Sequence, residues 1–165
     1  MIDNSHSVSG SFEPLYTGGA ETLWVGHDLS AEQVEVHGKR ILLVEDEAPV
    51  RASLRMVLEL DGHHVTEASN GAEALNLFAT GEFDLVITDF QMPMMKGNEL
   101  AVSIKLLAPS LPILMITASE KARGDVQNPV DALLTKPFTV PDLRWALGKL
   151  LSLRPDPAHL SAVPV

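Results

Sequence analysis

The chain has 165 residues, 45% of them apolar, and a formal net charge of −10 at pH 7. This length and apolar content suit one globular domain with tails and argue against a wholly disordered chain. The acidic balance argues against non-specific binding to nucleic acid, and the lack of cysteine excludes disulfides. The sequence also has no apolar stretch of ~20 residues and no N-terminal signal pattern. We therefore expect a cytoplasmic protein with no membrane insertion.

Residues 1–38 differ from the rest and predict a leader or linker that is mostly irregular. They are rich in Ser, Gly and acidic residues, and their one short apolar piece is Thr-Leu-Trp-Val at residues 22–25. We expect at most one small element there, ahead of a folded domain that covers residues 39–152.

From residue 39 onward, apolar patterns alternate between those typical of strands and of helices. Residues 41–44 form an unbroken apolar run, as expected for a strand covered on both faces. Pro49 stands where a first-turn proline is favoured, at the start of a helix that Gly62 ends. The inner side of this first helix is marked by Val50, Leu54, Val57 and Leu58. A second strand is predicted at residues 64–68.

The middle of the domain repeats this alternation. Asn70 and Glu73 form a capping pair for a second helix, which Gly81 ends. Residues 83–88 then predict a third strand, which runs directly into Asp89. A third helix is marked by Leu100, Ile104 and Leu107.

The last part of the domain is less regular. Residues 113–116 predict a fourth strand and residues 132–134 a short fifth strand. Because Gly124 and Pro129 interrupt the segment between them, the fourth helix is expected to be short, irregular or missing. Residues 153–165 contain three prolines and no period, and predict a disordered tail. The inner face of the last helix is formed by Leu143, Leu147, Leu150 and Leu151.

Five strands that alternate with helices predict an α/β fold, a parallel sheet with helices on both faces. Ligand sites in such sheets lie beyond the carboxyl ends of the strands. At those ends stand Glu45 and Asp46 after the first strand, Asp89 after the third, Thr117 after the fourth and Lys136 after the fifth.

These strand-end residues predict phosphoryl chemistry. Carboxylates held close together resist ionisation unless a cation joins them, and oxygen-rich clusters suit Mg²⁺. A carboxylate placed between a cation and an ammonium group can act as a nucleophile toward phosphorus. Asp89 is the predicted nucleophile, Lys136 a fixed positive charge and Thr117 a hydrogen-bond donor to an incoming oxygen.

The chain resembles the receiver domain family of bacterial two-component signalling over roughly residues 39–152. The matching stretches are Ile-Leu-Leu-Val-Glu-Asp-Glu at 41–47, Asn-Gly-Ala-Glu-Ala-Leu at 70–75, Phe-Asp-Leu-Val-Ile-Thr-Asp-Phe-Gln-Met-Pro at 83–93, Ile-Thr-Ala-Ser at 116–119 and Leu-Thr-Lys-Pro-Phe at 134–138. The resemblance implies a flavodoxin-like (βα)5 doubly wound sheet with strand order 2-1-3-4-5.

The resemblance also implies a role for each site residue. Asp89 would be the phosphoacceptor, Thr117 the switch hydroxyl and Lys136 the partner of a phosphoryl oxygen, with a cis bond to Pro137. The small side chain of Ala118 would leave the phosphoryl group room to enter. The ligands of a Mg²⁺ (or Mn²⁺) ion would be Glu45, Asp46, Asp89 and the backbone carbonyl of Gln91.

Members of the family are signalling phosphoacceptors rather than enzymes. The implied partner is a histidine kinase or histidine phosphotransfer domain, output is by protein contact, and a homodimer is left open. We expect the kinase to dock on Ala48, Pro49, Arg51, Ala52, Pro137 and Phe138.

Two departures from the family fall on the usual output face. Leu133 stands where the family usually has an aromatic ring that reports phosphorylation, and the segment between Thr117 and Lys136 is shorter than usual. Two other functions remain open. One is a pseudo-receiver that acts only through protein contacts. The other is a flavodoxin-like ligand domain, which the acidic loop at residues 45–47 disfavours because it would repel a phosphate.

Overall fold

The computed structural model describes residues 23–24, 37–118 and 129–152. Its elements follow the predicted alternation closely. Their bounds are β1 (Leu23–Trp24), β2 (Arg40–Val44), α1 (Ala48–Leu60), β3 (His64–Ala68), α2 (Gly71–Thr80), β4 (Leu85–Asp89), α3 (Gly97–Leu107), β5 (Ile113–Thr117), β6 (Ala132–Thr135) and α5 (Val140–Ser152).

All the strands join one parallel sheet in the order β1-β6-β5-β4-β2-β3. Without β1, this is the predicted five-stranded order 2-1-3-4-5, which is therefore confirmed. The leader contributes the sixth strand, β1, which pairs with β6 through Leu23↔Ala132 and Trp24↔Leu133. The predicted fourth helix and C-terminal tail lie in residues 119–128 and 153–165, outside the described residues.

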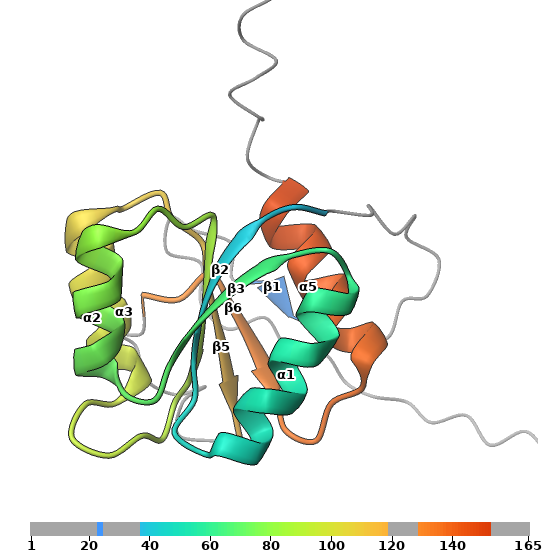
Figure 1. Cartoon of the computed structure of the whole chain (residues 1–165), viewed down its shortest axis with the longest axis horizontal. Coiled ribbons are helices and arrows are strands. Elements are labelled where there is room, and N and C mark those ends of the chain that lie inside the picture. The colour runs from blue at the N-terminus through green and yellow to red at the C-terminus, as the bar shows by residue number, and fades with distance from the viewer. Residues whose placement is uncertain (1–22, 25–36, 119–128, 153–165) are drawn as a thin grey trace, which may run out of the picture.

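Helices cover both faces of the sheet, with α2 and α3 on one side and α1 and α5 on the other (Figure 1). Successive residues of a strand point to opposite faces, so each central strand contributes to two cores. In β2, Leu42 and Val44 pack toward α2 and α3, whereas Ile41 and Leu43 pack toward α1 and α5. This two-sided burial explains the unbroken apolar run in the sequence.

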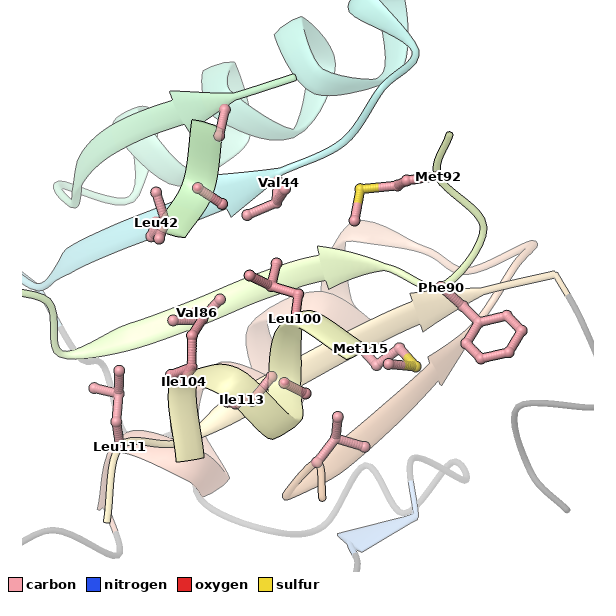
Figure 2. Packing of buried hydrophobic residues seen from close by; sticks show 14 of the residues in the cluster. Leu42, Val44, Val86, Phe90, Met92, Leu100, Ile104, Leu111, Ile113 and Met115 are labelled. Carbon is pink, nitrogen blue, oxygen red and sulfur yellow. The ribbon is translucent and has the colours of Figure 1, made fainter. Parts of the chain in front are cut away.

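The core beneath α2 and α3 is closed by residues from the third helix and from the loop after β4 (Figure 2). Leu100 and Ile104 are fully buried there, and Met92 reaches the same cluster from the loop. Leu107, whose spacing helped to predict α3, instead has 68% of its surface exposed and is the last residue of the helix. Within the described residues, no helix combines the length and the apolar character needed to cross a membrane.

An ion pair fastens α5 to the end of α1. Arg144 donates from Nε to Asp61 Oδ2 at 2.8 Å and from Nη2 to Asp61 Oδ1 at 2.7 Å. These hydrogen bonds lower the pKa of Asp61 below its ordinary value. The two-point geometry favours the pair, but the Arg144 side chain is 49% exposed, so solvent screening limits its contribution.

We predict that the Asp61–Arg144 pair makes stability depend on pH. A carboxyl group with a lowered folded-state pKa adds stability above its unfolded pKa, and this is lost as the pH falls through the folded value. A double-mutant cycle of Asp61→Asn and Arg144→Gln, measured by urea unfolding, should give a small favourable coupling at pH 7. The coupling should vanish well below the ordinary Asp61 pKa of 3.8. A coupling that is the same at both pH values would contradict this account.

Candidate functional site

The parallel sheet brings the predicted site residues to one edge. Asp89 ends β4 and Thr117 ends β5, while Glu45 and Lys136 directly follow β2 and β6. The register aligns these ends, because Asp89 pairs with Ile116 and Thr117 pairs with Thr135. All four residues lie at the carboxyl edge of the sheet, as the strand-end rule predicts.

The centre of this edge is an ammonium group between two buried carboxylates. Lys136 Nζ donates to Asp89 Oδ1 at 2.8 Å and to Glu45 Oε2 at 3.2 Å. Glu45 is 1% exposed and Asp89 is 7% exposed. Buried charges of this kind are tolerated only when they are paired and hydrogen-bonded. The contacts join positions 47 and 91 residues apart in the chain, so only the fold assembles them.

Backbone N–H groups bind the remaining carboxylate oxygens. Gln91 N donates to Asp89 Oδ2 at 2.6 Å, and Glu47 N donates to Glu45 Oε1 at 3.2 Å. Each of the four oxygens of Glu45 and Asp89 therefore accepts a hydrogen bond. These bonds fix both carboxylates before any ligand arrives.

The pKa values of Glu45 and Lys136 are both raised at this edge. Burial raises the pKa of Glu45, even though the Glu47 N–H and Lys136 act to lower it. Burial alone would lower the pKa of Lys136, but its contacts with Asp89 and Glu45 outweigh that effect and raise it. Two buried carboxylates, those of Glu45 and Asp89, therefore share one ammonium group. A bound cation would relieve this imbalance.

The donors at this edge fit a magnesium ion in kind. Mg²⁺ binds hard oxygen ligands, keeps several waters and uses only one or two carboxylates. In the described part of the chain, no three acidic or histidine side chains gather closely enough to form a metal cluster by themselves. Between Glu45 and Asp89 lies the Lys136 ammonium instead. The predicted ligand set of Glu45, Asp46, Asp89 and the Gln91 carbonyl stays a prediction.

The other predicted residues lie around this centre. Thr117 is buried, and its carbonyl accepts a hydrogen bond from Lys136 N at 2.8 Å, which ties the ends of β5 and β6 together. Ala118 follows Thr117 and is exposed, as is Gln91. The bond between Lys136 and Pro137 is cis, as the sequence analysis expected.

Arg51 has a contact that the sequence analysis did not anticipate. It was expected on a docking surface, but its Nη1 donates to the Glu45 carbonyl at 2.6 Å. Long side chains on a helix tilt toward its N-terminus, so an arginine in the second turn of α1 can reach back to the preceding loop. That direction was the available signal in the sequence.

Comparison with known proteins identifies the family. A sequence model of the response regulator receiver domain matches residues 41–147. The chain belongs to the response regulator receiver family. This membership fits a role as a phosphoacceptor in two-component signalling.

Two curated response regulators illustrate the match. The response regulator receiver protein CpdR of Brucella abortus (strain 2308) is 41% identical over 116 residues, which cover 68% of this chain and 97% of CpdR. The response regulator MprA of Mycobacterium sp. (strain KMS) is 38% identical over 116 residues, again 68% of this chain. The chain spans nearly all of CpdR but only 50% of MprA.

Solved receiver structures share the fold. The response regulator protein TrrA of Thermotoga maritima, in complex with Mg²⁺-BeF, has a TM-score of 0.66 and 37% identity, covering 68% of this chain and 99% of its own. The structure of histidine kinase ThkA in complex with TrrA gives a TM-score of 0.64 at 37% identity, covering 68% of this chain and 98% of the matched chain.

We predict that Gly97 is required for the backbone around Asp89. A Cβ atom at Gly97 would lie 2.1 Å from the Asp89 carbonyl oxygen, which is backbone and cannot move aside cheaply. Gly97→Ala should therefore destabilise this receiver domain by about 2 kcal/mol in urea unfolding. Gly38→Ala is the matched control, because its cost, about 1 kcal/mol, comes from a φ of +69° and not from a contact. An equal or smaller loss for Gly97→Ala would refute this reading.

We also predict that Lys136 supports the stability of the metal-free domain. Lys136→Met leaves two buried carboxylates without a counter-charge, which should cost on the order of 2 kcal/mol at neutral pH with a chelator present. Adding Asp89→Asn removes one of these charges and should restore part of the loss. The coupling is measured from the unfolding free energies of wild type, Lys136→Met, Asp89→Asn and the double variant. Strictly additive effects of the two substitutions would contradict a shared charge centre.

Proposed function

We propose that this receiver domain accepts a phosphoryl group on Asp89 from a phosphohistidine of a kinase or phosphotransfer domain. The observation that carries the proposal is the Asp89 carboxylate at the end of β4, within 2.8 Å of Lys136 Nζ and 7% exposed. An Asp89 oxygen forms a bond to phosphorus as the phosphorus–nitrogen bond of the donor breaks. The histidine ring leaves with the electron pair, takes up a proton, and an acyl phosphate remains on Asp89.

The chain's own groups position the reactants and balance charge. Lys136 fixes one carboxylate oxygen of Asp89 and the Gln91 N–H fixes the other, so the side chain has a defined orientation. The Thr117 hydroxyl is the proposed donor to a phosphoryl oxygen, and the small Ala118 beside it leaves the entry open. The same groups then serve self-catalysed dephosphorylation, so the domain acts as a signalling phosphoacceptor and not as an enzyme on other substrates.

Glu45, Asp46, Asp89 and the Gln91 carbonyl would hold a Mg²⁺ (or Mn²⁺) ion. When bound, the ion would neutralise the negative charge that builds up between the acidic side chains and the phosphoryl oxygens. The excess of carboxylates over ammonium at this edge supports this assignment. So does the Mg²⁺-BeF complex of TrrA, a protein similar to this one.

A histidine kinase is the proposed donor partner. The ThkA–TrrA complex shows a related response regulator bound to its kinase. Beside the site, Ala48, Pro49, Ala52 and Pro137 are exposed and Phe138 is partly exposed, so this surface is open to a partner. Output by protein contact in the cytoplasm is part of the proposal. A homodimer stays open, and Leu133, in place of the family's usual aromatic residue, is buried.

The test is phosphorylation by a small acyl phosphate or phosphoramidate donor, read out as a mass increase of one phosphoryl group. Wild-type protein should be modified with Mg²⁺ and unmodified with excess chelator, and Asp89→Asn should abolish the modification. Asp84→Asn is the matched control, because Asp84 directly precedes β4, whose other end is Asp89. Its modification should be unchanged. No response from wild-type protein, or an equal response from Asp89→Asn, would favour a pseudo-receiver that works only through protein contacts.

A further inference from the structure

We propose that Arg51 is a positioning residue that holds the Glu45–Asp46 backbone in the geometry required to bind the cation. The inference rests on the proposed function, because it concerns the same metal-binding acids. It assigns to this arginine a task in the site, in place of the docking contact expected from its sequence position.

The guanidinium group of Arg51 binds the loop by its main chain. Nη1 donates to the Glu45 carbonyl at 2.6 Å and makes a longer contact of 3.4 Å with the Asp46 carbonyl. These carbonyls belong to the two residues whose side chains would bind the cation. Arg51 therefore fixes the backbone from which both carboxylates project, through its bonds to the two main-chain carbonyls.

The arginine is itself held from the other side. Its Nε lies 3.4 Å from Glu67 Oε1, on β3, and its side chain is only 18% exposed. Arg55, one turn further along α1, pairs with the other Glu67 oxygen at 3.0 Å. Glu67 is thus shared by two arginines, of which only Arg51 touches the loop in the bonds described. Because its side chain contacts the loop on one side and Glu67 on the other, Arg51 has few accessible rotamers.

Arginine suits this task better than lysine. The planar guanidinium presents several N–H donors in a fixed fork, so it can bind carbonyl oxygens on one side and a carboxylate on the other. An ammonium group is a compact point charge on a flexible chain and cannot span the same partners. The positive charge also acts nearby: the pKa of Glu73 is lowered, mainly by its bonds from Ser69 and further by Arg51.

Loss of Arg51 should affect cation binding more than the transfer step. Asp89 and Lys136 do not touch Arg51 in the described bonds, so the nucleophile would keep its orientation. The Glu45–Asp46 backbone would lose its cross-link and sample other orientations. Residues that orient metal ligands typically change metal affinity by 10–100-fold when they are replaced.

The experiment compares Arg51→Met and Arg51→Lys with wild type, and uses Arg55→Met as the matched control. Arg55→Met removes an arginine of the same helix that pairs with the same glutamate but leaves the loop contact intact. The first readout is the Mg²⁺ concentration that half-saturates phosphorylation by a small acyl phosphate. It should rise on the order of 10-fold in Arg51→Met, while the rate at saturating Mg²⁺ changes by less than about threefold. Arg55→Met should match wild type.

Two further readouts do not need phosphorylation. The first is the rise in thermal midpoint on adding Mg²⁺, which should require more Mg²⁺ in both Arg51 variants. The second is amide hydrogen exchange at Glu47 with chelator present. It should be faster in Arg51→Met, because the bond from Glu47 N to the Glu45 side chain depends on the loop. If Arg51→Met does not fold, Arg51→Lys answers the same questions.

The outcomes separate this inference from the proposed function. Unchanged Mg²⁺ midpoints in both Arg51 variants overturn the positioning role, and so does an equal shift in Arg55→Met. Wild-type protein that binds Mg²⁺ but is not phosphorylated counts against the proposed function alone, because the thermal shift still tests Arg51. Normal behaviour with the small donor, combined with impaired transfer from a kinase, would return Arg51 to the docking surface and overturn the inference.

Discussion

The site depends on one electrostatic arrangement, the Lys136 ammonium shared between the buried carboxylates of Glu45 and Asp89. Two like charges removed from water repel each other and lose hydration, so they stay together only if a cation lies between them. A single ammonium offsets part of that cost, while burial still raises the pKa of Glu45. This edge thus holds two buried carboxylates against one ammonium, and it is where we propose that a divalent cation binds.

The parallel sheet makes this arrangement attainable. Each contributing residue lies at or just beyond the carboxyl end of a strand, while the strand interiors are apolar and buried on both faces. The hydrophobic cores set which strands lie side by side, and the register then sets how far each polar group extends beyond the edge. The apolar interiors of these strands therefore stabilise the fold, and the polar residues at their carboxyl ends form the site.

The sequence was sufficient to predict those features that follow from local patterns. Apolar runs located the strands, the Asn70–Glu73 pair located the start of α2, and the strand-end rule brought Asp89, Glu45 and Lys136 together. Three other features depend on tertiary context. Leu107 keeps the helical period yet is exposed, β1 is too short to show a pattern, and the pairing of Arg51 with Glu67 joins α1 to a strand distant in the sequence. Exact hydrogen-bond distances likewise follow from packing and not from spacing along the chain.

The two-residue strand β1 has a consequence for how the domain behaves among other proteins. The outermost strand of a sheet carries unpaired N–H and C=O groups, which invite another chain to add on and can start aggregation. In this protein the leader places β1 beside β6, so a segment of the same polypeptide shields part of that border. A shortened protein that began at β2 would lack this β1–β6 pairing and would leave the backbone groups of β6 that β1 pairs open to another strand.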